Sequence, residues 1–163
     1  MTVPDRATTP ALLQVDAILS RISGRPALQE VCRFLRQSFS HYPWVGVYRL
    51  EGTELVLDAW DGPQATEHSR IPLELGICGQ AAREDRTVIV DDVRSDPNYL
   101  ACFLETRAEI VVPVRYGGRV VGEIDIDGNA VSVFDASDRR FLESVAEKLG
   151  PALERAAAEP PPE

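Results

Sequence analysis

Two of the three cysteines and several acidic residues on predicted strands fall within the stretch from Gly76 to Asp127, and their types allow thiol chemistry. Cys102 lies in a predicted loop, 91–108, that is rich in polar residues, and an exposed thiol in such a loop is a better nucleophile than one on an apolar helical stripe. Cys78 is predicted at the start of a short helix, where backbone N–H groups favour a thiolate. Two structural alternatives remain open, since Cys102 could anchor its loop and Cys78 could be a small residue in a tight turn. Cys32 falls on an apolar stripe, so we expect it to be buried.

Asp125 and Asp127 are two residues apart in a predicted strand, so their carboxyl groups point to the same face. Two such carboxyls raise each other's pKa, which keeps one protonated near neutral pH to act as an acid, and the pair can also bind an ammonium group. Glu109 opens the neighbouring predicted strand and could join them. Glu123 has the same parity, and alternating acids and isoleucines are also typical of a solvent-facing strand, so that alternative stays open.

Hydrophobic periodicity and turn signals predict the elements that position these residues. We expect helices from Ala11 and over 28–39, strands over 44–50, 54–60 and 68–73, a helix over 78–84, strands over 87–90, 109–115 and 119–127, and a last helix after Asp135 with a kink or break at 150–151. Residues 91–108 form a long loop with one helical turn near 103–106, and such loops are often functional lids. This order predicts an α+β fold with a central antiparallel sheet and the N- and C-terminal helices packed on one face.

A chain of 163 residues suits one domain. We place it at residues 11–157, between a flexible N-terminal tail at 1–10 and a Pro-rich C-terminal tail at 158–163. The first and last helices are expected to lie side by side, and their exposed faces could supply a homodimer interface.

Composition argues against several partner classes. The net charge of −9 disfavours nucleic acid and anionic membranes. No apolar run approaches the roughly 20 residues of a membrane span. The N-terminus lacks the pattern of a signal peptide, so we expect a cytoplasmic protein. An odd number of cysteines predicts no disulfide framework, and the absence of CxxC and HExxH spacings predicts no metal.

The order of elements and several short segments resemble the GAF fold, and more specifically the free methionine-(R)-sulfoxide reductases, over roughly residues 11–155. The segments that carry the resemblance are WVGVY at 44–48, WDG at 60–62, RIP at 70–72, GICG at 76–79, DDV at 91–93, AC at 101–102, EIVVP at 109–113 and DID at 125–127. Their order and spacing together are specific, although each segment alone is weak.

The resemblance implies reduction of free L-methionine (R)-S-oxide without a metal or organic cofactor. In that family the cysteine aligned with Cys102 attacks the sulfoxide sulfur. The acids aligned with Glu109, Asp125 and Asp127 hold and protonate the substrate. A tryptophan aligned with Trp60 encloses the substrate methyl group, although a rim aromatic remains the alternative.

The resemblance also bears on recycling of the thiol. In that family the cysteine aligned with His68 commonly resolves the oxidised thiol. Here we expect Cys78 to form the disulfide with Cys102, which a thioredoxin-like donor reopens. The chain departs from the family pattern at His68, which replaces the third cysteine, and at Phe103, which replaces an aspartate. His68 could stabilise a thiolate or donate a proton, or be a half-exposed strand histidine. These departures leave a non-catalytic GAF sensor or dimerisation module as the alternative function.

Overall fold

The computed structural model describes residues 8–101 and 103–160. Its elements are α1 (Thr8–Arg21), α2 (Gly24–Ser38), β1 (Trp44–Glu51), β2 (Glu54–Asp61), β3 (Arg70–Pro72), α3 (Gly76–Glu84), β4 (Val88–Val90), the 3₁₀ helix η1 (Val93–Ser95), β5 (Ala108–Tyr116), β6 (Arg119–Gly128) and α4 (Ala136–Ala157). Cys102, the predicted nucleophile, lies outside the described residues.

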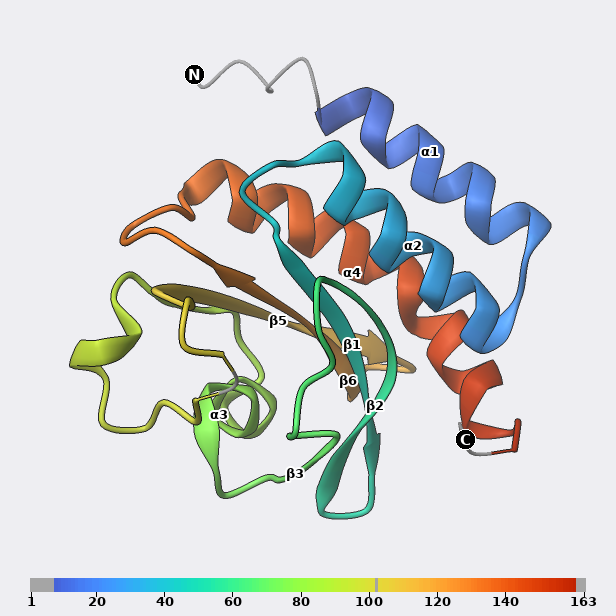
Figure 1. Cartoon of the computed structure of the whole chain (residues 1–163). Coiled ribbons are helices and arrows are strands. Elements are labelled where there is room, and N and C mark those ends of the chain that lie inside the picture. Colours follow the sequence, from blue (N-terminus) through green and yellow to red (C-terminus); the bar gives the residue numbers. More distant parts are fainter. Residues whose placement is uncertain (1–7, 102, 161–163) are drawn as a thin grey trace.

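The strands form one six-stranded antiparallel sheet in the order β3-β2-β1-β6-β5-β4. β1 and β6 are the two central strands, and β5 pairs with β6 on its other side (Figure 1). In this register Asp127 lies opposite Glu109 of β5, and Asp125 lies opposite Gly46 of β1. Opposed residues share a face, so the pairing places acids from two strands side by side.

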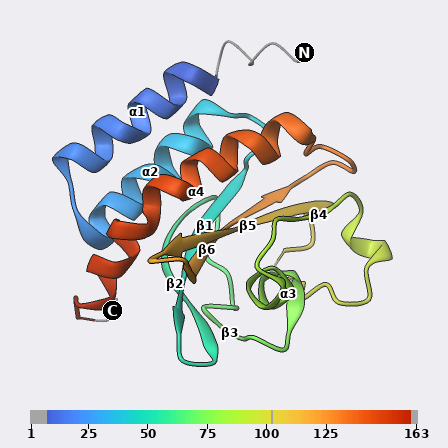
Figure 2. The same ribbon diagram turned by 180° about the vertical axis from the view of Figure 1, so that it is seen from behind.

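Three helices cover one face of the sheet and one covers the other. α2 and α4 pack on the sheet, and α1 lies over both of them on the outside (Figures 1 and 2). An ion pair of 2.8 Å between Lys148 and Asp16 joins α4 to α1, which confirms that the first and last helices lie side by side. α3 covers the opposite face, against β5 and β6. The predicted α+β architecture is confirmed.

Two layers of apolar side chains hold this arrangement. The isoleucines of β6, Ile124 and Ile126, point toward α2 and α4 and belong to the larger core. Tyr48, Ile77 and Val111 belong to a smaller core under α3. Because helices cover both faces, the central strands have no solvent-facing side.

The structure corrects two predictions at prolines. The predicted break at 150–151 is wrong, because α4 continues through Pro151 to Ala157. α2 begins at Gly24 rather than near residue 28, so Pro26 lies within its first turn, where a missing N–H leaves no intrahelical bond unmade.

The loop and its neighbouring strand also differ from expectation. The helical turn predicted near 103–106 is only a hydrogen-bonded turn, closed by the Thr106 N–H on the Phe103 carbonyl at 3.4 Å. The loop instead carries η1, which begins where the Asp92 side chain accepts a bond from the Arg94 N–H. β3 is shorter than predicted, because the His68 N–H donates to Thr66 Oγ1 rather than to a neighbouring strand.

Candidate functional site

Four buried carboxyl groups face α3 from the neighbouring strands β5 and β6. We call Glu109, Glu123, Asp125 and Asp127 the acid cluster; each is at most 4% exposed. The solvent-facing alternative is therefore wrong, because α3 covers the acids while α2 and α4 cover the isoleucines between them. Glu123, whose parity had favoured that alternative, belongs to the cluster.

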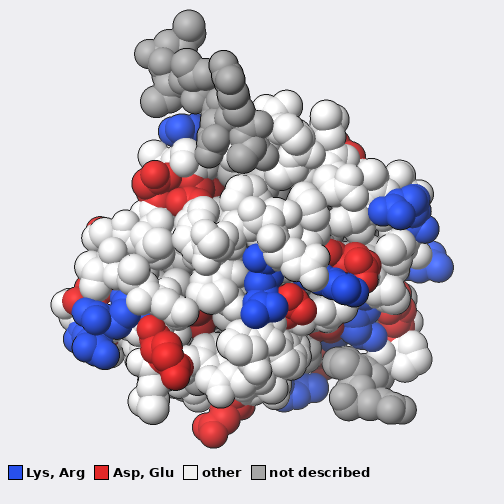
Figure 3. Space-filling model, turned by 45° about the horizontal axis from the view of Figure 1, so that its top comes forward, with Lys and Arg blue, Asp and Glu red and all other residues white. Residues whose placement is uncertain are grey.

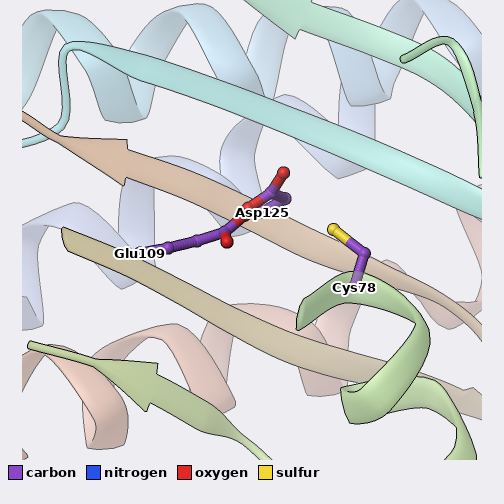
Figure 4. Close-up of side chains that lie close together, drawn as sticks. All are labelled: Cys78, Glu109 and Asp125. Atoms are coloured by element: carbon purple, nitrogen blue, oxygen red, sulfur yellow. The ribbon is translucent and has the colours of Figure 1, made fainter. Parts of the chain in front are cut away.

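The cluster meets the N-terminal turn of α3. Cys78 is the third residue of α3, and its sulfur points toward Glu109 and Asp125 (Figure 4). One donor atom from each of these three residues lies within 4.8 Å of the other two. They line a cavity of about 10 Å³, which holds about one water molecule. Leu100 also lines this cavity, so the 91–108 loop reaches the acids.

The start of α3 requires a glycine. Gly76 has φ of +72°, and a Cβ added there would lie 3.3 Å from the Leu100 Cβ. Glycine adopts this left-handed conformation without steric cost. Its small size therefore lets α3 and the loop approach each other beside the acids.

Burial raises the pKa values of Glu123, Asp125 and Asp127. The charge of Asp125 raises those of Glu123 and Asp127 further. Hydrogen bonding with Glu109 opposes the rise at Asp125 and Asp127 without cancelling it. Burial is the largest cause at each of the three. The predicted effect of one carboxyl on its neighbour is found at Asp127, so the cluster retains protons at a pH where exposed carboxyls have lost theirs.

Several oxygens of the cluster lack a partner of good hydrogen-bond geometry among the described residues. They are both oxygens of Asp127, both of Glu123 and Oδ1 of Asp125. Glu109 still lies close enough to Asp127, and the Cys78 thiol close enough to Glu123, to influence the pKa of each. Buried acceptors without partners are rare, and they favour a ligand that brings several N–H donors.

The two described cysteines are both buried thiols. The expectation that the helix start favours a Cys78 thiolate is wrong, because burial raises the pKa of Cys78 and the charges of Asp125 and Glu123 raise it further. A helix terminus is a weaker influence than burial beside several acids. Burial also raises the pKa of Cys32, which lies in the helix-side core as predicted.

The aromatic residue opposite Asp127 differs from the predicted Trp60. Trp44 begins β1 opposite Asp127. These two residues and Phe103 line a cleft of about 320 Å³. Trp60 stacks on Trp44, with ring centroids 6.3 Å apart, and lines a different cleft beside Gln29. Only the pairing of β1 with β6, which the sequence does not reveal, could have identified Trp44.

Residues on both sides of Cys102 are held against the site. The Ala101 carbonyl lies 2.9 Å from Nε2 of His68, so the ring donates this bond. The His68 carbonyl accepts a bond of 2.8 Å from the Tyr48 hydroxyl, which ties this segment to β1. Phe103 packs on Trp44 at a centroid distance of 5.7 Å. His68 and Phe103, where the chain departs from the family pattern, therefore both make contacts beside Cys102.

Comparison with known proteins agrees with this geometry. The family described as "GAF domain" matches residues 25–154. The chain belongs to the GAF-domain family.

Among its relatives are free methionine-R-sulfoxide reductases. This GAF chain is 39% identical over 110 residues to "Free methionine-R-sulfoxide reductase" of Saccharomyces cerevisiae, which covers 65% of this chain and 60% of the relative. The type II free methionine-R-sulfoxide reductase of Thermoplasma acidophilum is 42% identical, with a TM-score of 0.78 over 80% of this chain and 92% of that one. The Neisseria meningitidis free methionine-R-sulfoxide reductase, solved in complex with its substrate, is 32% identical, with a TM-score of 0.85 over 96% and 95%.

The surface of this GAF domain carries charges of both signs. On the face in Figure 3, basic and acidic side chains are intermixed and form no continuous basic strip. Within residues 8–101 and 103–160, no helix has the length and apolar character needed to cross a membrane.

Proposed function

We propose that this GAF domain reduces free L-methionine (R)-S-oxide to methionine, with Cys102 as the nucleophile. The acid cluster is the observation that carries the proposal. A free amino acid brings an α-ammonium group with three N–H donors, and the cluster offers buried carboxylate oxygens that lack partners. A methionine sulfoxide inside a peptide has no such ammonium, so the cluster favours the free amino acid. The similarity to reductases of this specificity supports the same conclusion.

The cleft lined by Trp44, Phe103 and Asp127 suits the substrate in size and polarity. Its volume of about 320 Å³ is within the range of small-ligand pockets, whereas the cavity beside Cys78 is far smaller. We place the ammonium group at Asp127 and the methyl thioether end against the two rings. Burial of the aliphatic end against aromatic surface then adds to the electrostatic attraction.

The chemical step transfers the sulfoxide oxygen from the substrate sulfur to the sulfur of Cys102. The Cys102 thiolate attacks the sulfoxide sulfur, and the oxygen takes a proton from Glu109, Asp125 or Asp127, of which the two aspartates have raised pKa values. The protonated oxygen then passes from the substrate sulfur to the Cys102 sulfur. The S–O bond of the substrate and the transient bond between the two sulfurs break, an S–O bond to Cys102 forms, methionine leaves, and Cys102 becomes a sulfenic acid. The methionine sulfoxide is thereby reduced by two electrons and the thiol is oxidised by two.

Recycling follows from the position of Cys78 beside the acids. Its thiol attacks the sulfenic acid, water leaves, and a Cys78–Cys102 disulfide forms. A thioredoxin-like dithiol supplies two electrons and two protons to reopen it. The raised pKa of Cys78 makes this thiol a slow nucleophile, so direct reduction of the sulfenic acid by the donor is the competing route. Such a cycle needs a reducing compartment, in keeping with the expected cytoplasmic location.

A turnover assay with thioredoxin, thioredoxin reductase and NADPH tests the proposal. Free methionine (R)-oxide should be reduced, whereas its (S) epimer and N-acetylmethionine (R)-oxide, which lacks the ammonium, should not. Cys102→Ser should abolish turnover, and Cys32→Ala is the matched control that should retain it. Saturable binding of the free amino acid without turnover would show that the protein is a sensor rather than an enzyme. Full activity of Cys78→Ser would show that the donor reduces the sulfenic acid directly.

We also propose a homodimer through the outward faces of α1 and α4. Leu13 is 65% exposed and lies on the side of α1 that faces away from α2 and α4, where a second copy could cover it. Light scattering should give twice the 18.0 kDa chain mass, and Leu13→Lys should restore the monomer mass.

A further inference from the structure

Three donor atoms of two chemical types meet beside α3. They are the Cys78 sulfur and one carboxylate oxygen each from Glu109 and Asp125, within 4.8 Å of one another. Each comes from a regular element, α3, β5 or β6, so the set is held by the fold rather than by a mobile loop (Figure 4). One sulfur with two oxygens is a donor set that Zn²⁺ accepts, usually in a four-coordinate arrangement.

An independent observation indicates that this place can accept a cation. Oδ1 of Asp125 is buried and has no partner among the described residues, and Asp125 lines the cavity that the three donors share. A volume of about 10 Å³ accommodates one ion or one water molecule but not an amino acid. An anionic oxygen in such a place is costly unless a cation or a donor compensates it.

The surrounding side chains fit the role of outer partners. Glu123 lies beside Cys78, close enough to raise the pKa of the thiol by charge and hydrogen bonding. Glu109 lies against Asp127, its direct partner across the β5–β6 ladder. Outer carboxyl groups of this kind orient ligands, and their loss typically weakens metal binding by about 10–100-fold.

We propose that Cys78, Glu109 and Asp125 bind a single Zn²⁺ ion. Binding replaces the thiol proton and any carboxyl protons by the metal, and these protons pass to solvent. The fourth position is left to water or to Glu123. Mg²⁺ and Ca²⁺ prefer six or more oxygen ligands, so the thiol selects against them.

The ion also regulates the site. A dication beside the acid cluster removes the charge that attracts an ammonium group and occupies the thiol needed for the disulfide. Zn²⁺ is therefore a reversible inhibitor; this part of the inference rests on the proposed function.

Calorimetric titration of the reduced full-length protein with ZnCl₂ tests the site. One ion should bind per chain, protons should be released, and MgCl₂ should give no binding at the same concentrations. Cys78→Ser should weaken Zn²⁺ binding by more than the roughly 10–100-fold typical of losing an outer partner. Cys32→Ala, a matched change of the other described thiol, should leave it unaltered. Equal Zn²⁺ affinity in wild type and Cys78→Ser would refute the proposed site. Loss of Zn²⁺ binding in Cys102→Ser but not in Cys78→Ser would refute it as well.

Two further measurements keep the result independent of folding and of turnover. Co²⁺ in the wild-type protein should give a sulfur-to-metal absorption band that is absent in Cys78→Ser, and Asp125→Asn provides a second ligand variant. A wild-type protein that binds Co²⁺ without this band would overturn the thiolate ligand. Zinc binding at Cys78 in a protein without reductase activity would confirm the site and refute the proposed function, whereas unchanged turnover with Zn²⁺ bound would refute only the inhibition.

Discussion

Replacing Asp127 by asparagine should weaken substrate use and stabilise the fold at the same time. Asp127 is 2% exposed, both of its oxygens lack a good partner, and Asp125 raises its pKa beyond the effect of burial. Asn has nearly the same size, so the change removes a charge without leaving a cavity.

The loss of binding can be estimated from the contact proposed. A hydrogen bond to a charged group contributes about 1.5–3 kcal/mol, and each 1.4 kcal/mol corresponds to about a tenfold change in an equilibrium constant. Asp127→Asn should therefore lower kcat/KM for free methionine (R)-oxide by about 10–150-fold. Most of the loss should fall on KM, because the ammonium is bound in the ground state as well as in the transition state.

The gain in stability has the opposite sign. Leaving a buried polar group unsatisfied costs about 1–3 kcal/mol, and we take the lower end because the amide stays buried. A gain of about 1 kcal/mol raises Tm by roughly 2–4 °C in a protein of this size.

The gain should also depend on pH. The folded-state pKa of Asp127 lies above its unfolded value near 3.9, so the folded state holds a proton that the unfolded state releases. The stabilisation that this bound proton gives the wild-type fold is fully present below about pH 4 and is lost as pH rises through the folded-state pKa of Asp127. Thermal melts should thus show a larger gain for Asp127→Asn at pH 8 than at pH 4.

Asp16→Asn is the matched control. Asp16 is half exposed and pairs with Lys148 on the helical face, far from the acid cluster, so its loss should cost at most about 1 kcal/mol and leave kcat/KM unchanged. An Asp127→Asn protein with wild-type kcat/KM, or with a Tm below that of Asp16→Asn, would refute the reasoning.

Three further predictions follow from the same contacts. His68→Ala should lower kcat/KM by about 2–10-fold through loss of the bond to Ala101, and His68→Gln should restore part of it; equal activity in both variants would contradict a hydrogen-bonding role. Phe103→Ala removes a ring pair worth about 0.5–1.5 kcal/mol and should raise KM about 2–10-fold, whereas Phe103→Tyr should not; an unchanged KM in Phe103→Ala would exclude the ring from the site. Native reduced protein alkylated at pH 7.5 should be modified slowly at Cys32 and Cys78, both buried thiols with raised pKa values, as mass spectrometry of tryptic peptides would show; rapid labelling of either would contradict its burial.

Local patterns were sufficient to predict most elements and the shared direction of the acids. The period of two along a strand places Asp125 and Asp127 on one face whatever the rest of the fold does. The same pattern could not show whether that face is buried, because the cover comes from α3, about 45 residues earlier in the chain. For the same reason the helix-start argument failed at Cys78, whose pKa depends on acids brought in from β5 and β6.

Contacts between segments that are distant in the chain could not be predicted from the sequence. The bond between His68 and Ala101 spans 33 positions. Trp44 lies opposite Asp127 only because β1 pairs with β6. Trp60, the tryptophan that was predicted, stacks on Trp44 instead. Pro151 lies within a continuous helix because packing outweighs local propensity, and Gly150 lets the helix pass close to the Arg115 carbonyl.

A single-turnover experiment tests the central claim most directly. Fully reduced protein, free of thioredoxin and other thiols, is mixed with excess free methionine (R)-oxide, and methionine is quantified together with dimedone labelling of sulfenic acid. We expect about one methionine per chain, with the label on Cys102 in the Cys78→Ser variant and no product from Cys102→Ser. Equal methionine formation by Cys102→Ser and wild type would contradict it.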